Sequence, residues 1–334
     1  MNRRDLDAFV AHHQLSPAAV DAVLDIAAAR PGSAEIRRFV LRLLQLAGVL
    51  SLAAGVVFFI AANWQEFGVA GRFALVQGIL IASVALALWR PPPHSLGRYA
   101  LLMAFIATGV LLALFGQTYQ TGADVYELFL TWTLLGLPFV AAGQWSVICA
   151  AWLAVLNVSL WLFFGWRPQG GWLWAVFSPW RVSTSVLLLA PAALNLLLWA
   201  FTQRLKRSRW SSLAPRWLAR LALAFAFAFL TWGGIDAVAK SSMDGDDALA
   251  LLMVLGLEAG VAAYALRKRD DVFPLALTAG SLIALSTCTL GAHAGFGDLG
   301  MFFVLGLWLV VSSTISGRVL MAQVRAWRHE EDAA

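Results

Sequence analysis

The sequence predicts an all-α protein, a polytopic bundle of about ten membrane-spanning helices with both termini in the cytoplasm. Hydrophobic residues make up 60% of the 334 residues, well above the roughly 45–50% that is usual in soluble domains. Ten apolar runs have lengths near the roughly 20 residues that a helix needs to cross a bilayer. Basic residues fall almost entirely in alternate connections between these runs, which is the pattern of a multi-pass membrane protein.

The predicted spans and the segments around them divide the chain into five parts. A short cytoplasmic helical segment, 1–33, precedes five spans in 34–165, a Trp-rich interfacial loop in 166–181, five more spans in 182–317 and a cytoplasmic tail, 318–334. The ten spans are 43–62, 73–89, 99–115, 125–142, 144–164, 182–201, 217–235, 247–266, 272–292 and 299–317.

The positions of Lys and Arg set the predicted orientation. Of the 24 basic residues, twenty lie on the side of the two termini, and the opposite side has only Arg72, Arg167, Arg181 and Lys240. Because cytoplasmic loops carry the excess of Lys and Arg, both termini are expected in the cytoplasm. The net charge of +5 then belongs to loops that face anionic lipid headgroups, and we do not expect binding to nucleic acid.

The N-terminal segment is predicted to form two short helices, 3–13 and 17–30. Ser16 followed by Pro17 is a typical helix start, but about thirty residues cannot bury a core of their own. The segment should therefore pack on the cytoplasmic face or on a partner. The tryptophans of the loop 166–181 are typical of the aromatic belt at a membrane surface, and a surface for stacking on sugars or headgroups is the alternative.

Glu258 is the most costly residue in any predicted span. It lies nine residues before Arg267, which places it roughly 13 Å inside the bilayer. An ionised carboxylate at that depth costs at least about 2.5–3.5 kcal/mol, so Glu258 should face the bundle interior or a water-filled cavity. Asn157 and Asn195 lie at a similar depth and are its expected partners. These three residues form either a proton- or cation-coupled binding site or a structural, hydrogen-bonded cluster.

A second candidate site lies at the tips of the first two helical hairpins, on the predicted periplasmic side. Both hairpins place amide side chains beside an aromatic residue, and we expect these tips to meet in one binding rim. Helix capping is the alternative for part of this set, since Asp is a favoured N-cap residue. The candidate rim residues are Asn63, Trp64, Gln117, Tyr119, Gln120 and Asp124.

Motifs for catalysis, metals or cofactors do not stand out. The five histidines lack the spacing of a zinc site, and there is neither a nucleophile elbow nor a phosphate-binding or dinucleotide-binding loop. The run from Asp244 to Asp247 lacks the ligand spacing of an EF-hand loop and is expected to cap a helix. We expect no catalytic residue, no metal and no cofactor.

Three stretches resemble the bacterial membrane proteins grouped as domain-of-unknown-function family 2157. They are Leu15-Ser16-Pro17, Ala61-Ala62-Asn63-Trp64 and the run from Gly116 to Asp124. The resemblance covers residues 1–165 and implies a bacterial inner-membrane protein. It also implies, as a partner, a second membrane-anchored protein that is encoded nearby and is named for a Gly-Asp-Tyr motif. The family supplies no catalytic residues.

These observations predict a non-enzymatic subunit or scaffold of a membrane complex, which contacts its partner through the Trp- and amide-rich periplasmic face. The alternative is a proton- or cation-coupled transporter or a lipid translocator with its site at Glu258. The two functions differ in one structural requirement, because a transporter needs a polar cavity that reaches Glu258, whereas a scaffold can be packed solid around it.

Overall fold

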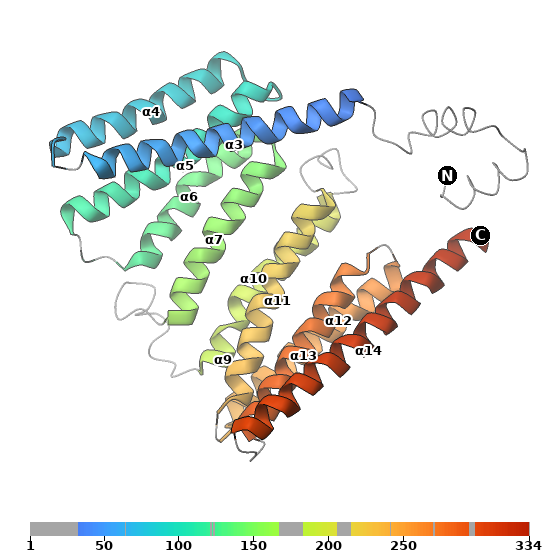
Figure 1. The fold of residues 1–334 in the computed structure, drawn as a ribbon. Coiled ribbons are helices and arrows are strands. Elements are labelled where there is room, and N and C mark those ends of the chain that lie inside the picture. The colour runs from blue at the N-terminus through green and yellow to red at the C-terminus, as the bar shows by residue number, and fades with distance from the viewer. Residues whose placement is uncertain are drawn as a thin grey trace, which may run out of the picture. The chain divides into compact units, whose positions relative to one another are not determined.

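The computed structural model describes residues 33–63, 65–120, 122, 124–166, 183–205, 215–240, 242–269, 271–293 and 298–333. Over these residues the protein is helical and has no strand. Ten helical segments are long and apolar enough to cross a membrane, which confirms the predicted fold class. The helices are α3 (Ser33–Ala62), α4 (Val69–Trp89), α5 (Ser95–Tyr119), α6 (Val125–Gly143), α7 (Ser146–Trp166), α9 (Thr184–Leu187), α10 (Leu189–Leu205), α11 (Arg216–Val238), α12 (Gly245–Lys268), α13 (Phe273–His293) and α14 (Asp298–Ala333) (Figure 1).

Two segments singled out in the sequence lie outside the described residues. The predicted helices 3–13 and 17–30 belong to the first 32 residues, and nearly all of the Trp-rich loop falls within 167–182. Their predicted structures stay predictions.

The chain divides into two compact units, Met1–Arg72 and Phe73–Ala334. The described part of the first unit consists of α3, the turn after it and the beginning of α4. In that turn Phe67 packs edge-on against Phe59, with the ring centroids 5.7 Å apart. The second unit contains the remaining spans, the three residues Glu258, Asn157 and Asn195, and the rim residues from Gln117 to Asp124.

From α5 onward, helices that follow one another in the chain are neighbours. α5 packs on α6 and α6 on α7, and α12, α13 and α14 pack in the same sequential way (Figure 1). α11 is central to the second half, because it contacts α7, α9, α10, α12 and α13. Accordingly, Leu223, Ala226 and Leu230 of α11 are almost completely buried.

Glycines allow close packing between α5 and α6. A Cβ atom at Gly109 would lie 2.4 Å from the ring of Trp132, and one at Gly136 would lie 2.5 Å from the ring of Phe105. The indole nitrogen of Trp132 also donates a hydrogen bond to the Phe105 carbonyl at 2.8 Å. In this helix pair, aromatic rings pack directly against glycine residues, and a hydrogen bond joins the two helices. Small residues and interhelical hydrogen bonds are both common where helices pack in membranes.

The sixth predicted span, 182–201, is interrupted in the structure. The short helix α9 ends at Leu187, and α10 begins at Leu189. Pro191 explains the interruption, because proline has no N–H to donate to the carbonyl four residues earlier and its ring crowds that carbonyl. Ser183 caps the start of α9 by accepting a hydrogen bond from the backbone N–H of Val186.

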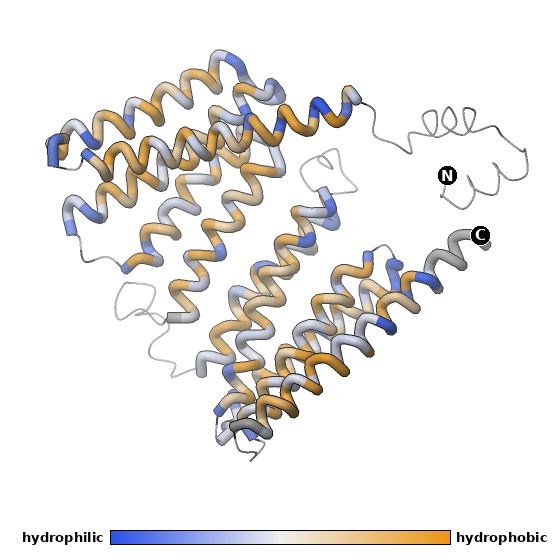
Figure 2. The backbone as a smooth tube through the Cα atoms, viewed as in Figure 1, coloured by the Kyte–Doolittle hydropathy of each residue, from blue (hydrophilic) through white to orange (hydrophobic). Residues whose placement is uncertain are grey.

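Hydropathy along the backbone agrees with a membrane setting. Hydrophobic residues run along the helices, and the most hydrophilic residues gather at helix ends and in connections (Figure 2). Large apolar side chains also remain exposed, among them Phe302, Phe303 and Leu307 of α14. Such faces suit contact with lipid, where apolar exposure carries no cost.

Candidate functional site

Glu258 lies on α12 with 1% of its surface exposed. Its Oε1 atom accepts a hydrogen bond of 2.5 Å from the hydroxyl of Ser281 on α13. The Ser281 hydroxyl in turn accepts one of 2.7 Å from the hydroxyl of Thr231 on α11. The side chain is therefore buried, as the sequence predicts, and it ends a chain of hydroxyls that crosses three helices.

The carboxyl group of Glu258 sits between two apolar layers. One turn before it, Val254 belongs to a cluster with Leu230 and Leu285. One turn after it, Val261 belongs to a second cluster with Leu223 and Phe227. The Oε2 atom has no hydrogen-bond partner among the described residues, so these residues satisfy only one of the two carboxyl oxygens.

The structure pairs Asn157 with Asn195, and it does not join them to Glu258. Nδ2 of Asn157 donates to Oδ1 of Asn195 at 3.1 Å, and Nδ2 of Asn195 donates to Oδ1 of Asn157 at 2.8 Å. The remaining amide protons go to carbonyls of their own helices, those of Leu153 and Pro191, at 2.8 and 2.9 Å. The two amides use all their donors in this way, and no hydrogen bond of the described residues links either of them to Glu258.

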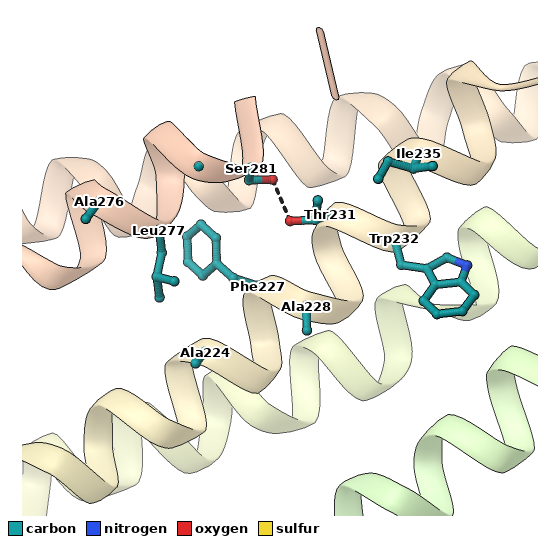
Figure 3. Close-up of a pocket in the computed structure, with 10 residues that line it drawn as sticks. Ala224, Phe227, Ala228, Thr231, Trp232, Ile235, Ala276, Leu277 and Ser281 are labelled. Atoms are coloured by element: carbon teal, nitrogen blue, oxygen red, sulfur yellow. Dashed lines mark hydrogen bonds between the residues drawn. The ribbon is translucent and has the colours of Figure 1, made fainter. Parts of the chain in front are cut away.

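A groove between α11 and α13 exposes the outer end of the hydroxyl chain. Its volume is about 480 Å³, and Thr231 and Ser281 both line it. Figure 3 shows their hydrogen bond in the middle of the groove, with Phe227 and Leu277 on one side and Trp232 and Ile235 on the other. The remaining lining residues are Ala224, Ala228, Ala276 and Gly280.

Three of the predicted rim residues line a second groove, where α5 ends and α6 begins. Gln117, Gln120 and Asp124 share this groove of about 710 Å³ with Glu127. Asp124 occupies the N-cap position of α6, but its side chain makes no capping hydrogen bond. Capping therefore does not account for this carboxylate, and it is available to the groove.

Of the other rim residues, Tyr119 is not part of the lining of this groove. Tyr119 is 57% exposed and packs against Phe115 and Phe73, at centroid distances of 4.8 and 6.0 Å. The side chain of Asn63, in the first unit, donates to the Phe59 carbonyl at 2.8 Å and thereby caps the end of α3. Trp64 is outside the described residues. A rim shared by both hairpin tips stays a prediction.

An ion pair between a buried carboxylate and a half-buried lysine was not foreseen in the sequence. As expected, Asp244 caps α12, since its carboxylate accepts the backbone N–H of Asp247 at 2.8 Å. Asp247 itself is 1% exposed, and its Oδ1 atom accepts hydrogen bonds of 2.6 Å from Lys240 and from Ser185 of α9. The other carboxylate near Lys240 is Asp236, at 3.5 Å. The sequence feature that could have predicted this ion pair is Lys240, the one basic residue between Asp236 and Asp247.

These carboxylates change the acidity of Lys240, which lies in the connection between α11 and α12. Partial burial acts to lower the pKa of its ammonium group. The hydrogen bond to Asp247 and the negative charges of Asp236 and Asp247 outweigh burial, so the pKa is raised above its usual value. Lys240 is thereby held in its charged form.

No cluster of three or more His, Cys, Asp or Glu side chains in the described part of the chain could hold a metal ion. The described sites consist of a carboxyl group at the end of a hydroxyl chain, two amides that hydrogen-bond to each other, an ion pair with a buried carboxylate, and an acidic groove.

Of the two candidate sites, only the periplasmic rim lies in the segment that matches a known family. The model of the family described as "Predicted membrane protein (DUF2157)" matches residues 7–149. This segment is similar to that family and contains every candidate rim residue, while Glu258, Asn157 and Asn195 all lie beyond it. No curated protein and no solved structure matches the chain.

Proposed function

We propose that this membrane protein is a non-enzymatic subunit or scaffold of a complex in a bacterial inner membrane, with both termini in the cytoplasm. The observation that carries the proposal is the groove of Gln117, Gln120, Asp124 and Glu127 at the end of α5 and the start of α6. It brings together Gln117, Gln120 and Asp124, which the sequence alone selected, and it lies within the segment similar to the family.

The chemistry of this groove suits a basic protein partner. Its charged lining residues are two carboxylates, and none of its described lining residues is Lys or Arg. Tyr126 donates a hydrogen bond of 3.2 Å to Glu127 and so orients that carboxylate. Apolar lining from Phe115 and Leu128 adds area for packing. A segment that presents Lys or Arg beside apolar residues would complement it, and the partner we propose is a second membrane-anchored protein, as the family resemblance implies.

Site-specific photocrosslinking in living cells tests this proposal. A photoreactive amino acid at Gln120 should give a discrete crosslinked protein, because Gln120 would face the partner. Gln144 offers a matched control: both glutamines cap a helix with left-handed backbone geometry, at φ 42°, but Gln144 lies at the other end of α6. Asp124→Asn combined with Glu127→Gln should weaken the Gln120 crosslink several-fold. Equal crosslinking at both glutamines, or none at Gln120, would refute the proposal.

Proton- or cation-coupled transport, or lipid translocation, at Glu258 is a second candidate function. The observation that favours it is a buried carboxyl group with one oxygen atom unpartnered among the described residues. Proton flux into proteoliposomes under an imposed potential provides the test. Glu258→Gln should abolish that flux while leaving the protein folded, because the amide keeps the shape of the carboxyl group. Unchanged flux in this variant would exclude a proton-carrying role.

A further inference from the structure

We propose that the groove between α11 and α13 binds a lipid-soluble ring carbonyl compound, the chemistry of a quinone and its quinol. The inference goes beyond the proposed scaffold function and does not depend on a partner at the α5–α6 groove. It rests on the groove's depth in the membrane, on the hydroxyl chain that ends in it and on the rings beside that chain.

Depth restricts the occupant to molecules that bring a polar group deep into the hydrocarbon. Thr231 is seven residues from the end of α11 at Val238, and Ser281 is eight residues from the start of α13 at Phe273. At 1.5 Å per residue, both hydroxyls lie roughly 10–12 Å inside their helices. Phospholipid headgroups and ester groups stay at the membrane surface, so an ordinary acyl chain would offer no hydrogen bond to the accepting lone pairs of the Thr231 hydroxyl.

The hydroxyl chain can run in two directions. As it stands, Thr231 donates to Ser281 and Ser281 donates to Glu258, so Thr231 can still accept a hydrogen bond from a ligand hydroxyl. When Glu258 carries a proton, the carboxyl group can donate to Ser281, Ser281 to Thr231, and Thr231 to a ligand carbonyl. A quinol has the hydroxyl and a quinone has the carbonyl, so both forms match one direction of the same chain.

Apolar and aromatic side chains lie on both sides of the Thr231 hydroxyl. Phe227 and Trp232 line the groove around Thr231, and Leu277 and Ile235 extend it (Figure 3). Aromatic rings favour offset or edge-on contact with another flat ring. A volume of about 480 Å³ lies in the range of small-molecule pockets, which are mostly apolar with a few placed polar groups.

Photoaffinity labelling of the full chain in lipid nanodiscs tests the site. The probe is a short-chain azidoquinone, and mass spectrometry locates its adducts. The expected adducts fall on peptides that contain residues 224–235 or 276–281, and unlabelled quinone should compete with them. Labelling spread evenly over the lipid-facing helices would overturn the proposal, since it would indicate partitioning into the bilayer without a site.

Two variants test the hydrogen bonds without disturbing the packing. Thr231→Val keeps the volume and removes the terminal hydroxyl, and Ser281→Ala breaks the chain behind it. Each should reduce probe affinity about 3- to 10-fold, the range for one hydrogen bond. Thr278→Val is the matched control, because the Thr278 hydroxyl donates to the Pro274 carbonyl of its own helix and is not part of the groove lining. The probe affinity of this variant should be unchanged.

Competing occupants give different results. If a phospholipid acyl chain fills the groove, native mass spectrometry should show phospholipid retained equally by the wild-type protein and by Thr231→Val, with no competition by quinone. That outcome overturns the proposal. Elution of each variant as a single symmetric size-exclusion peak establishes that a loss of labelling reflects the site and not unfolding.

Discussion

Asn157 and Asn195 hold each other through two reciprocal hydrogen bonds, and each amide also donates to a carbonyl of its own helix. The pair joins α7 to α10 and is buried. All four amide protons are used within the pair and its own helices, so none remains for a ligand. The pair is therefore a structural contact between two helices.

A double-mutant cycle on this pair should show coupling. We expect Asn157→Leu and Asn195→Leu each to lower the free energy of unfolding by about 1–2 kcal/mol, because each strands one amide. The double variant should lose less than the sum, with a coupling energy of about 0.6–1.7 kcal/mol, the range for polar pairs in membrane bundles. Unfolding by SDS in mixed micelles, followed by tryptophan fluorescence, measures it. Strict additivity would show that the two bonds contribute nothing jointly.

Removal of Lys240 should destabilise the protein through Asp247. Lys240→Met leaves the Asp247 carboxylate, which is 1% exposed, with one hydrogen bond from Ser185 and without its counter-ion. We expect a loss of about 2–3 kcal/mol, at or below the low end of the range for a broken buried pair, because the lysine side chain is 36% exposed. Adding Asp247→Asn to Lys240→Met should recover part of the loss. Thermal unfolding in detergent checks both variants.

The same lysine predicts alkaline sensitivity. The pKa of Lys240 is raised in the folded protein, so its stabilising effect is complete below the unfolded value of about 10.4 and is lost as pH rises through the folded pKa. As pH rises above about 10.4, the wild-type melting temperature should fall further than that of Lys240→Met, and below that pH the difference between the two proteins should stay constant. Parallel decreases in the two proteins would contradict the assignment of this effect to Lys240.

Gly109→Ala should disturb the contact between α5 and α6. The added methyl group would lie 2.4 Å from the ring of Trp132, so the ring must move and its hydrogen bond to Phe105 weakens. We expect a loss of about 1–3 kcal/mol, typical of overpacking. Gly256→Ala is the control, because nothing lies within 4 Å of a Cβ atom at Gly256, and it should be neutral or slightly stabilising. Equal stabilities for the two variants would contradict the close packing.

Reporter fusions test the predicted orientation. An alkaline phosphatase or green fluorescent protein fusion at Gln120 should report the periplasm, and one at Ala334 should report the cytoplasm, because twenty of the 24 basic residues lie on the side of the termini. The same compartment for both fusions would remove the ten-helix topology.

Hydropathy and the cost of burying charge account for what the sequence could predict. The lengths of the apolar runs predict the spans, which the structure has as helices. The free-energy cost of an ionised group in hydrocarbon predicts that Glu258 is buried. Depth alone cannot select partners, because Asn157, Asn195 and Ser281 are expected at similar levels and the choice depends on which helices are neighbours. α12 packs on α13, and α7 packs on α10. Glu258 therefore bonds to Ser281, and the two asparagines bond to each other.

The acidic run before α12 shows the same limit. Asp244 and Asp247 look alike in sequence, and capping explains the first of them. Asp247 differs because α9 places Ser185 beside it and the preceding connection returns Lys240 to it. The break at Leu188 that creates α9 comes from Pro191, and its effect on a residue 56 positions further along has no local signal.

The asparagine pair between α7 and α10 has a consequence for membrane insertion. These helices are the fifth and sixth spans and are synthesised one after the other. If either helix entered the lipid alone, its asparagine would have no partner amide in the hydrocarbon. The same holds for the eighth and ninth spans, because Glu258 of α12 has its hydrogen-bond donor, Ser281, only after α13 is inserted. We expect each of these pairs to be released into lipid together as a hairpin, so that no midplane polar group waits for longer than the synthesis of one further helix.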